Sequence, residues 1–196
     1  MKKRVFIIHG WDGYPDEGWM LWLRRELEKR GFEIHSLAMP NTDKPRINKW
    51  VPFLEEKVGE PDENTYFIGH SIGCQTILRY LEKLPENIKV GGALFVAGWF
   101  NLKPAAMEDS EDAKIAQPWL ETPINHKKIL THTKKFTAIF SDNDPCVFVE
   151  DADLFKQKLG AKIIIQQNKG HFCEEDGIVE LPVVLDELLK ITENYE

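Results

Sequence analysis

Short apolar runs alternate with stretches of helical periodicity along almost the whole chain, and this alternation limits the fold more than any other feature. Each run is bounded by Gly, Pro, Asn or Asp and is nearly continuous in its hydrophobicity, as in strands buried on both faces. Strands that alternate with helices form a mostly parallel sheet with helices on both sides. We therefore expect an α/β fold with strands at Arg4–Ile8, Glu33–Leu37, Thr65–Ile68, Val90–Ala97, Phe136–Phe140 and Lys162–Ile165.

The stretches between these runs have the spacing of amphipathic helices. After Gly18, for example, Trp19, Trp22, Leu23 and Leu27 recur every three or four residues, so one face of the helix is apolar. The same pattern predicts helices at Gly18–Arg30, Arg46–Lys57, Ile72–Leu84, Val149–Leu159 and Ile178–Ile191.

One segment, Asn101–Lys134, interrupts the alternation. It contains Pro104, Pro118 and Pro123 and has only weak periodicity. Because it follows the fourth predicted strand, we expect an irregular segment over the C-terminal edge of the sheet. The chain has 196 residues and no repeat or linker, so we expect a single domain over residues 1–196.

Charge and cysteine content exclude several classes of protein. The chain has 25 basic and 32 acidic residues, a net charge of −7, and no basic stripe, so we expect no nucleic-acid partner. Its three cysteines form no even, patterned set, which favours a reduced, cytoplasmic protein. The longest apolar run, Val90–Phe100, is shorter than a membrane span, so no membrane partner is expected.

The pentapeptide GHSIG, residues 69–73, places a serine between two glycines, directly after the third predicted strand and before a predicted helix. A G-x-S-x-G turn at this place presents its serine at the C-terminal edge of the sheet, where active sites of open parallel sheets gather. The glycines let strand and helix approach closely around a strained turn. We predict Ser71 as a nucleophile, although the same pentapeptide also occurs in turns without a catalytic role.

A serine hydroxyl needs a histidine base, and the chain offers six histidines. His171 lies in the sequence NKGHF between the last predicted strand and the last predicted helix, at the same edge of the sheet as Ser71. We predict His171 as the base. The other histidines lie in the glycine turns, in mid-strand or in the irregular segment, and they are His9, His70, His35, His126 and His132.

An orienting acid is expected between the serine and the histidine, in the chain order that accompanies this type of turn. The sequence FSDNDPCV follows the strand Phe136–Phe140 and contains two candidates, Asp142 and Asp144. Asp144 lies further into the loop and precedes Pro145, whereas an aspartate at position 142 suits the capping of backbone donors. We favour Asp144 as the acid and keep Asp142 as the alternative.

Two backbone N–H groups are needed to stabilise the negatively charged oxygen that forms during attack on a carbonyl. One is expected from Ile72, at the N-terminus of the helix after the serine. The other is expected from the loop after the first strand, HGWDG, where Trp11 is favoured over Asp12. The ends of separate strands would thus contribute to one site.

These motifs resemble the α/β-hydrolase superfamily, and more narrowly the small serine hydrolases grouped with retinoblastoma-binding protein 9 and the bacterial YdeN-like proteins. The matching stretches are HGWDGYP, LAMPNTDKP, GHSIG, SDNDPCV and KGHF, in the same order over most of the chain. The resemblance implies a six-stranded parallel sheet in the order 2-1-3-4-5-6 without a large lid domain. It also implies Ser71, Asp144 and His171 as nucleophile, acid and base.

The chain departs from this family pattern at two points. Phe148 stands where a proline often follows the acid, which affects the rigidity of the loop and not the acid itself. None of the cysteines lies in an L-x-C-x-E motif, so retinoblastoma binding is not implied.

No cofactor or metal is expected. His171 and Cys173 lack further ligands at zinc-like spacing, and Cys74 is interpreted as a buried structural thiol. The first turn lacks G-x-G-x-x-G, and the chain has no G-x-x-x-x-G-K-[ST] phosphate loop. Aromatic residues that follow strand ends are expected to line an acyl pocket, and they are Trp11, Trp99, Phe100 and Phe172.

The sequence therefore predicts a serine hydrolase that cleaves small carboxylic esters through an acyl-enzyme intermediate. No insertion is large enough to build a deep lipid tunnel, so the expected partner is a small-molecule ester. Two alternatives stay open. One is a non-catalytic binding module that uses the cleft or the Asn101–Lys134 segment, and the other is an amidase, peptidase or acyltransferase with the same triad.

Overall fold

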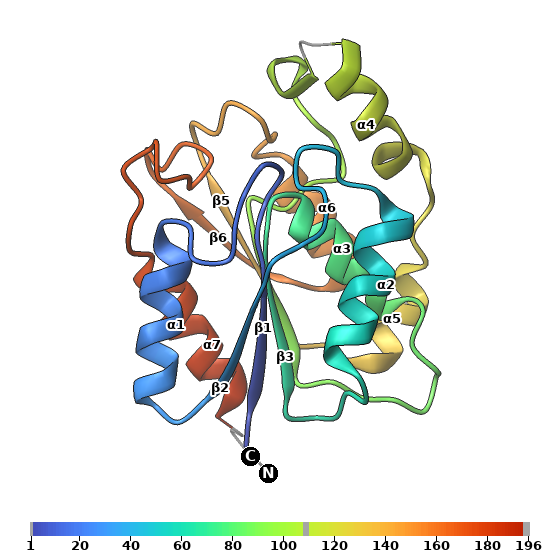
Figure 1. Cartoon of the computed structure of the whole chain (residues 1–196), viewed down its shortest axis with the longest axis vertical. Coiled ribbons are helices and arrows are strands. Elements are labelled where there is room, and N and C mark those ends of the chain that lie inside the picture. Colours follow the sequence, from blue (N-terminus) through green and yellow to red (C-terminus); the bar gives the residue numbers. More distant parts are fainter. Residues whose placement is uncertain (1, 108–109, 194–196) are drawn as a thin grey trace.

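The computed structural model of the protein describes residues 2–107 and 110–193. Parallel strands form a six-stranded sheet in the order β2-β1-β3-β4-β5-β6, which confirms the predicted fold (Figure 1). The strands are β1 (Arg4–Ile8), β2 (Glu33–Leu37), β3 (Thr65–His70), β4 (Gly92–Val96), β5 (Phe136–Ser141) and β6 (Lys162–Gln166).

Helices cover both faces of this sheet (Figure 1). One face carries α1 (Trp19–Lys29) and α7 (Pro182–Thr192). The opposite face carries α2 (Ile47–Val58), α3 (Ile72–Leu81), α5 (His126–His132) and α6 (Asp151–Leu159). This arrangement leaves the C-terminal edge of the sheet open for a site.

The sequence of β1 shows why its apolar run is continuous. Successive side chains of a strand point to opposite faces of the sheet. Val5 and Ile7 pack in the core beneath α1 and α7, whereas Phe6 and Ile8 pack in the core on the other face. All four side chains are buried, so none of these four positions tolerates a polar residue.

The segment Asn101–Lys134 is more regular than expected. It contains the short 3₁₀ helix η1 (Pro104–Met107), then α4 (Ser110–Glu121) and α5. The expectation of an irregular segment was wrong, because Pro118 lies in the last turn of α4, where a missing N–H removes one hydrogen bond without ending the helix. As expected, α4 lies beyond the C-terminal edge of the sheet (Figure 1).

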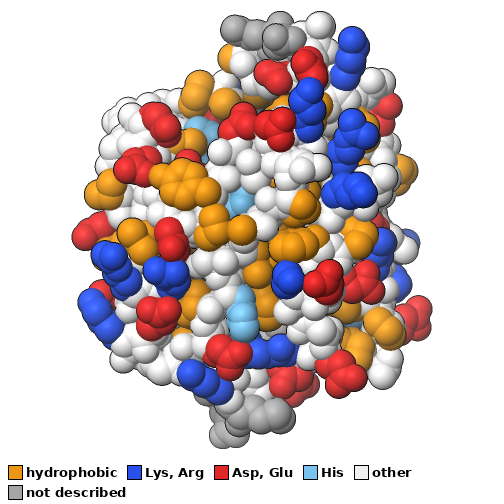
Figure 2. All heavy atoms as spheres, viewed as in Figure 1, with side chains coloured by type: hydrophobic (Ala, Val, Ile, Leu, Met, Phe, Trp, Pro, Cys, Tyr) orange, Lys and Arg blue, Asp and Glu red, His pale blue; other side chains and the backbone are white. Residues whose placement is uncertain are grey.

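The surface carries charges of both signs. Figure 2 shows acidic and basic side chains interspersed on the face that it displays. None of the helices in the described ranges is long and apolar enough to cross a membrane.

Candidate active site

Ser71 lies on the sharp turn between β3 and α3. Its backbone φ is +51°, a conformation that is unfavourable for a residue with a side chain and is common at functional turns. The Ser71 N–H donates to the carbonyl of Val96 over 2.9 Å, and the Cys74 N–H donates to the carbonyl of Ser71 over 3.0 Å. The turn is therefore fixed from both sides.

Gly69 and Gly73 allow the backbone to approach closely around this turn. A Cβ atom at position 69 would lie 2.7 Å from the backbone nitrogen of Cys74, and one at position 73 would lie 2.4 Å from the carbonyl oxygen of Ile8. Both distances are far below van der Waals contact, which is about 3.5 Å or more. A side chain at either position would push α3 away from the sheet.

Replacing Gly73 by alanine is expected to lower the free energy of unfolding by about 3 kcal/mol, because the atoms in the way belong to the backbone of β1. Gly160→Ala is the control, since a Cβ there meets nothing within 4 Å and only the left-handed backbone, with a φ of +65°, opposes it. That strain costs about 1 kcal/mol. Urea unfolding of both variants measures the difference, and equal losses would contradict the close-approach explanation.

His171 and Asp144 form a hydrogen-bonded pair. Nδ1 of His171 lies 2.8 Å from Oδ2 of Asp144, while Oδ1 of Asp144 accepts from the backbone N–H groups of Cys146 and Val147 over 2.8 and 2.9 Å. The Asp144 side chain is 3% exposed and that of His171 is 15% exposed. Because an ionised carboxylate only accepts hydrogen bonds, the neutral imidazole carries its proton on Nδ1 and its lone pair on Nε2.

Side-chain oxygens hold the loop that carries His171. The backbone N–H groups of residues 168, 169, 170 and 171 donate in turn to the side chains of Asp142, Ser141, Asn143 and Asp176, over 2.8, 3.0, 2.9 and 2.8 Å. Asp142 thus accepts from a backbone N–H, which is the capping role that the sequence suggested for it as an alternative to a catalytic one. Asp144, not Asp142, contacts the His171 imidazole.

His70, next to the serine in the chain, fixes the backbone of His171. Its Nε2 lies 2.7 Å from the His171 carbonyl oxygen, and since a carbonyl only accepts, Nε2 carries the proton. Burial first, and then the nearby His171, lower the pKa of His70 to about 3, so the ring is neutral. Sequence reasoning assigned this histidine to the turn alone, because a contact between residues 101 positions apart leaves no local signal.

The free energy of unfolding is expected to fall as the pH drops below 6.5, the ordinary pKa of the His70 side chain. Between that value and the folded-state pKa of about 3, the unfolded chain binds more protons than the folded chain. Stability therefore rises with pH in this window, by up to about 1.4 kcal/mol per pH unit.

The variant His70→Gln should lose this part of the pH dependence, since glutamine does not titrate and its amide N–H can still reach the His171 carbonyl. Urea unfolding on both sides of pH 6.5 measures the slope for each protein. A variant that keeps the whole wild-type slope would show that His70 is not its source.

Two free backbone donors lie at the serine turn. Among the hydrogen bonds of the described residues, the N–H groups of Trp11 and Ile72 have no acceptor. The N–H of Asp12 is occupied, because it donates to the carbonyl of Thr42 over 2.9 Å. Trp11 and Ile72 line the same cavity as Ser71, so both groups are available to a substrate oxygen there.

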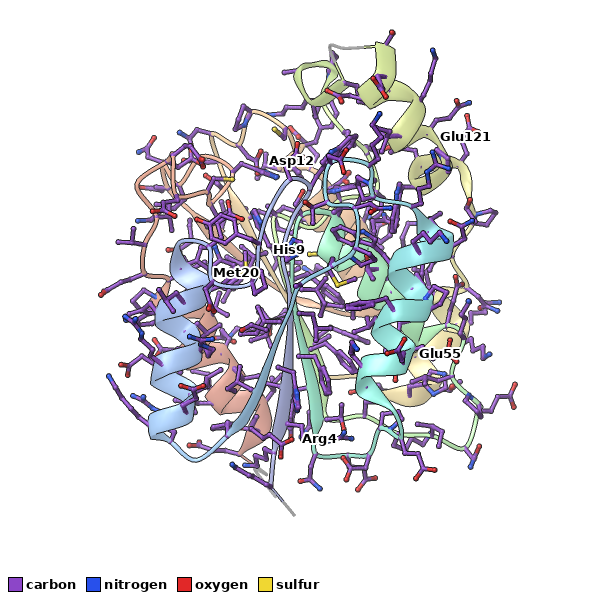
Figure 3. The ribbon with its side chains drawn as sticks, viewed as in Figure 1. Arg4, His9, Asp12, Met20, Glu55 and Glu121 are labelled. Carbon is purple, nitrogen blue, oxygen red and sulfur yellow. The ribbon has the colours of Figure 1, made fainter. Side chains whose placement is uncertain are left out.

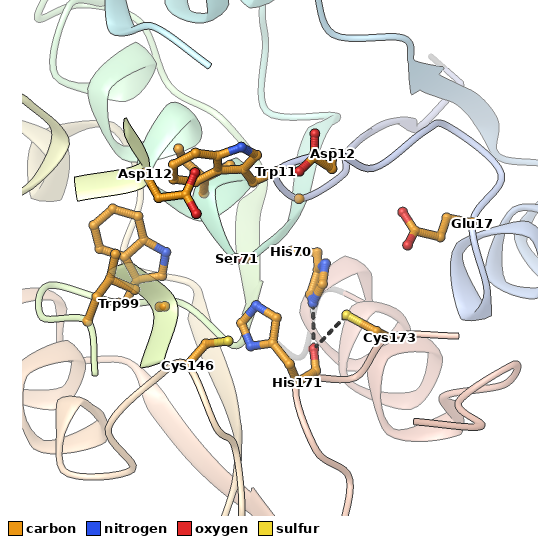
Figure 4. A pocket seen from close by; sticks show the side chains of 14 residues that line it. Trp11, Asp12, Glu17, His70, Ser71, Trp99, Asp112, Cys146, His171 and Cys173 are labelled. Carbon is orange, nitrogen blue, oxygen red and sulfur yellow. Dashed lines mark hydrogen bonds between the residues drawn. The ribbon is translucent and has the colours of Figure 1, made fainter. Parts of the chain in front are cut away.

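A cavity of about 230 Å³ lies in front of Ser71 (Figure 4). Its walls come from the loops after β1, β3, β4, β5 and β6, together with η1 and α4, as is usual at the C-terminal edge of a parallel sheet. In the same order, these segments contribute residues that include Trp11, Ser71, Trp99, Cys146, His171, Ala106 and Asp112.

Of the four aromatic residues expected to line the pocket, Trp11 and Trp99 do so. Phe172 is 1% exposed and packs in the core beneath α1 and α7. Phe100 packs against Phe155 with ring centroids 4.7 Å apart and lines a separate groove. The expectation for these two residues was wrong, because a position after a strand end does not determine where the side chain points. Phe172, for instance, has a φ of +59°.

Three carboxylates that sequence reasoning missed also line the cavity, those of Asp12, Glu17 and Asp112, and no Lys or Arg is among its described lining residues. Figure 3 shows Asp12 beyond the end of β1, on the side of α4. Burial raises the pKa of Glu17, and burial together with Asp43 and Asp112 raises the pKa of Asp12. The cavity therefore disfavours anionic groups.

Comparisons with known proteins agree with the fold. The chain matches the serine hydrolase family over residues 5–190. It is 32% identical over 188 residues to YdeN of Bacillus subtilis (strain 168), which covers 96% of this chain and 95% of that protein. It is 26% identical over 172 residues to the serine hydrolase RBBP9 of Rattus norvegicus, with 87% of each chain covered. The crystal structure of the B. subtilis ydeN gene product matches with a TM-score of 0.89 and 31% identity, over 97% of this chain and 99% of that one.

Proposed function

Since this chain belongs to the serine hydrolase family, we propose that it cleaves small carboxylic esters with Ser71 as nucleophile, His171 as base and Asp144 as acid. The observation that carries the proposal is that His171, hydrogen-bonded to the buried Asp144, lines the same cavity as a serine with a φ of +51°. A base held by a buried acid beside a strained serine is the arrangement that nucleophilic catalysis requires.

In the proposed reaction, Nε2 of His171 takes the proton of Ser71 as Oγ attacks the ester carbonyl. The N–H groups of Trp11 and Ile72 stabilise the negative charge on the carbonyl oxygen. The tetrahedral intermediate collapses, and His171 returns the proton to the departing alcohol. A water molecule, activated by the same imidazole, then hydrolyses the acyl-enzyme and releases the carboxylic acid product from Ser71. Asp144 keeps the imidazole in the required tautomer throughout.

The size of the cavity supports a modest acyl group. Its volume of about 230 Å³ is below the range of typical small-molecule sites, which occupy about 300–1,000 Å³. We expect a small-molecule ester as the partner and no cofactor, nucleic acid or membrane, and we expect a cytoplasmic location.

The carboxylates in the cavity wall predict discrimination by charge. We expect kcat/KM for p-nitrophenyl hemisuccinate to be at least about tenfold lower than for p-nitrophenyl butyrate, a difference of about 1.4 kcal/mol. The two acyl groups have similar lengths, but the first is an anion that approaches Asp12 and Asp112. The variant Asp112→Asn should narrow the gap. Equal rates for the two esters in wild type would refute an electrostatic role for the wall.

A fluorophosphonate probe tests the proposal directly. The folded protein should react at Ser71, and mass spectrometry of the labelled peptide identifies the residue. Absence of labelling would favour a binding module on the hydrolase fold. Esters should also be cleaved faster than anilides with the same acyl group, whereas faster cleavage of anilides would favour an amidase.

A further inference from the structure

Cys146 lies beside both the proposed acid and the proposed base. It follows Asp144 by two residues, and its backbone N–H donates to Oδ1 of that aspartate over 2.8 Å. One potential ligand atom from each of Asp144, Cys146 and His171 lies within 4.8 Å of the others. Figure 4 shows the thiol of Cys146 next to the His171 ring, on the side opposite to Cys173.

We propose that Asp144, Cys146 and His171 bind a zinc ion or another thiophilic divalent cation that inhibits the hydrolase, an inhibition that rests on the proposed function. A carboxylate, a thiolate and an imidazole are the ligand types that zinc takes from proteins. Magnesium and calcium prefer oxygen ligands throughout, so this set selects against them. With three protein ligands, a tetrahedral ion keeps one position for water.

Only a small rearrangement is needed to form this site. Bonds of about 2.0–2.3 Å at tetrahedral angles place two ligand atoms about 3.5 Å apart. The three ligand atoms lie within 4.8 Å of one another, so the longest separation has to shorten by no more than about 1.3 Å. Cys146 is only partly buried and lines the cavity, so a cation in the cavity can reach its thiol.

Zinc binding at His171 removes the base that catalysis needs. Asp144 lies on the Nδ1 side of the ring, 2.8 Å from that nitrogen, so an ion shared with Asp144 binds His171 through Nδ1. The ring proton then moves to Nε2, because a neutral imidazole with a metal on one nitrogen carries its proton on the other. A protonated Nε2 cannot accept the proton of Ser71.

Protons balance in this step. The Cys146 thiol releases its proton to solvent as its sulfur binds the cation, and the ring proton of His171 moves from Nδ1 to Nε2 without leaving the residue. No redox step occurs, and a chelator that removes the cation restores the starting state. The cation acts as an inhibitor and not as a cofactor of the reaction.

This site could not be predicted from the spacing of ligand residues along the sequence. The sequence suggested only His171 with Cys173 and offered no further ligands, because Asp144 lies 27 residues before His171. The adjacency of β5 and β6 in the sheet brings the two loops together.

The test compares wild type with Cys146→Ser and Cys173→Ser. Cys173 is a matched control, because it lines the same cavity but lies outside the three-ligand cluster. Zinc affinity is measured by competition with a chromophoric chelator, which does not depend on activity. Zinc inhibition of ester cleavage is measured separately, relative to the rate of each variant without metal. Ser71→Ala is added to the binding experiment as a protein without the nucleophile.

Wild type and Ser71→Ala should bind a single zinc ion with equal affinity, and EDTA should reverse the inhibition of wild type. Cys146→Ser should lose at least about tenfold in zinc affinity and in sensitivity to zinc. Cys173→Ser should stay within about twofold of wild type. Equal affinity of Cys146→Ser and wild type, equal losses in the two cysteine variants, or a zinc-bound enzyme at full activity would overturn the proposal. Zinc binding by a wild type that cleaves no ester supports the metal site and refutes the hydrolase function alone.

Discussion

Replacing Ser71 by alanine is expected to lower kcat for ester hydrolysis by about 10⁶-fold. Without Oγ no acyl-enzyme forms, and the remaining groups can only assist a water molecule that they are not arranged to hold. The loss should appear in kcat more than in KM, because the wall of the cavity and the N–H groups of Trp11 and Ile72 stay in place. Initial rates with p-nitrophenyl esters measure the effect.

The control for this variant is Ser36→Ala, on the edge strand β2 of the sheet. Its rate should stay within about twofold of wild type. Circular dichroism and urea unfolding establish that both variants fold. Activity of a folded Ser71→Ala variant equal to that of wild type would refute the mechanism.

The variant Asp144→Asn is expected to lower kcat by about 10⁴-fold with little change in the fold. The remaining amide oxygen can still accept from the N–H groups of Cys146 and Val147. The amide NH₂ then faces Nδ1 of His171, and because it donates a hydrogen bond, it favours the tautomer with the proton on Nε2. That tautomer cannot accept the proton of Ser71.

Asp142→Asn is the matched control, two residues away and with the same chemical change. Its amide oxygen can still accept from the N–H of Asn168, so we expect less than about a tenfold loss in kcat. The ratio of the two losses decides between the two aspartates. Comparable losses in both variants, or a larger one at position 142, would contradict the assignment of Asp144.

The fold could be predicted because its signals are local and repeated. In β1, Val5 to Ile8 must all be apolar, since both faces are covered by helices. A run of this kind fixes the strand without knowledge of its neighbours, and its alternation with helices implies the parallel sheet. The serine turn is local in the same way, because residues 69–73 join the end of β3 directly to the start of α3.

The rest of the site depends on long-range packing, which short stretches of sequence do not record. The hydrogen bond between His70 and the backbone of His171 joins two loops that are distant in the chain. Asp112 lines the cavity from α4. This helix was not predicted from the sequence, because it contains Pro118 and its helical periodicity is weak. Phe172 follows a strand end as predicted but turns inward, because the loop backbone, not the position in the sequence, directs its side chain.

Four side chains accept hydrogen bonds from the N–H groups of residues 168–171, and this limits which segments can be exchanged between relatives. Three of these four residues, Ser141, Asp142 and Asn143, precede the acid directly in the chain. Grafting the histidine loop from a relative without the aspartate loop would leave backbone donors facing foreign side chains, and the imidazole would lose its alignment. Chimeras of this protein should therefore retain activity only when both segments come from the same parent.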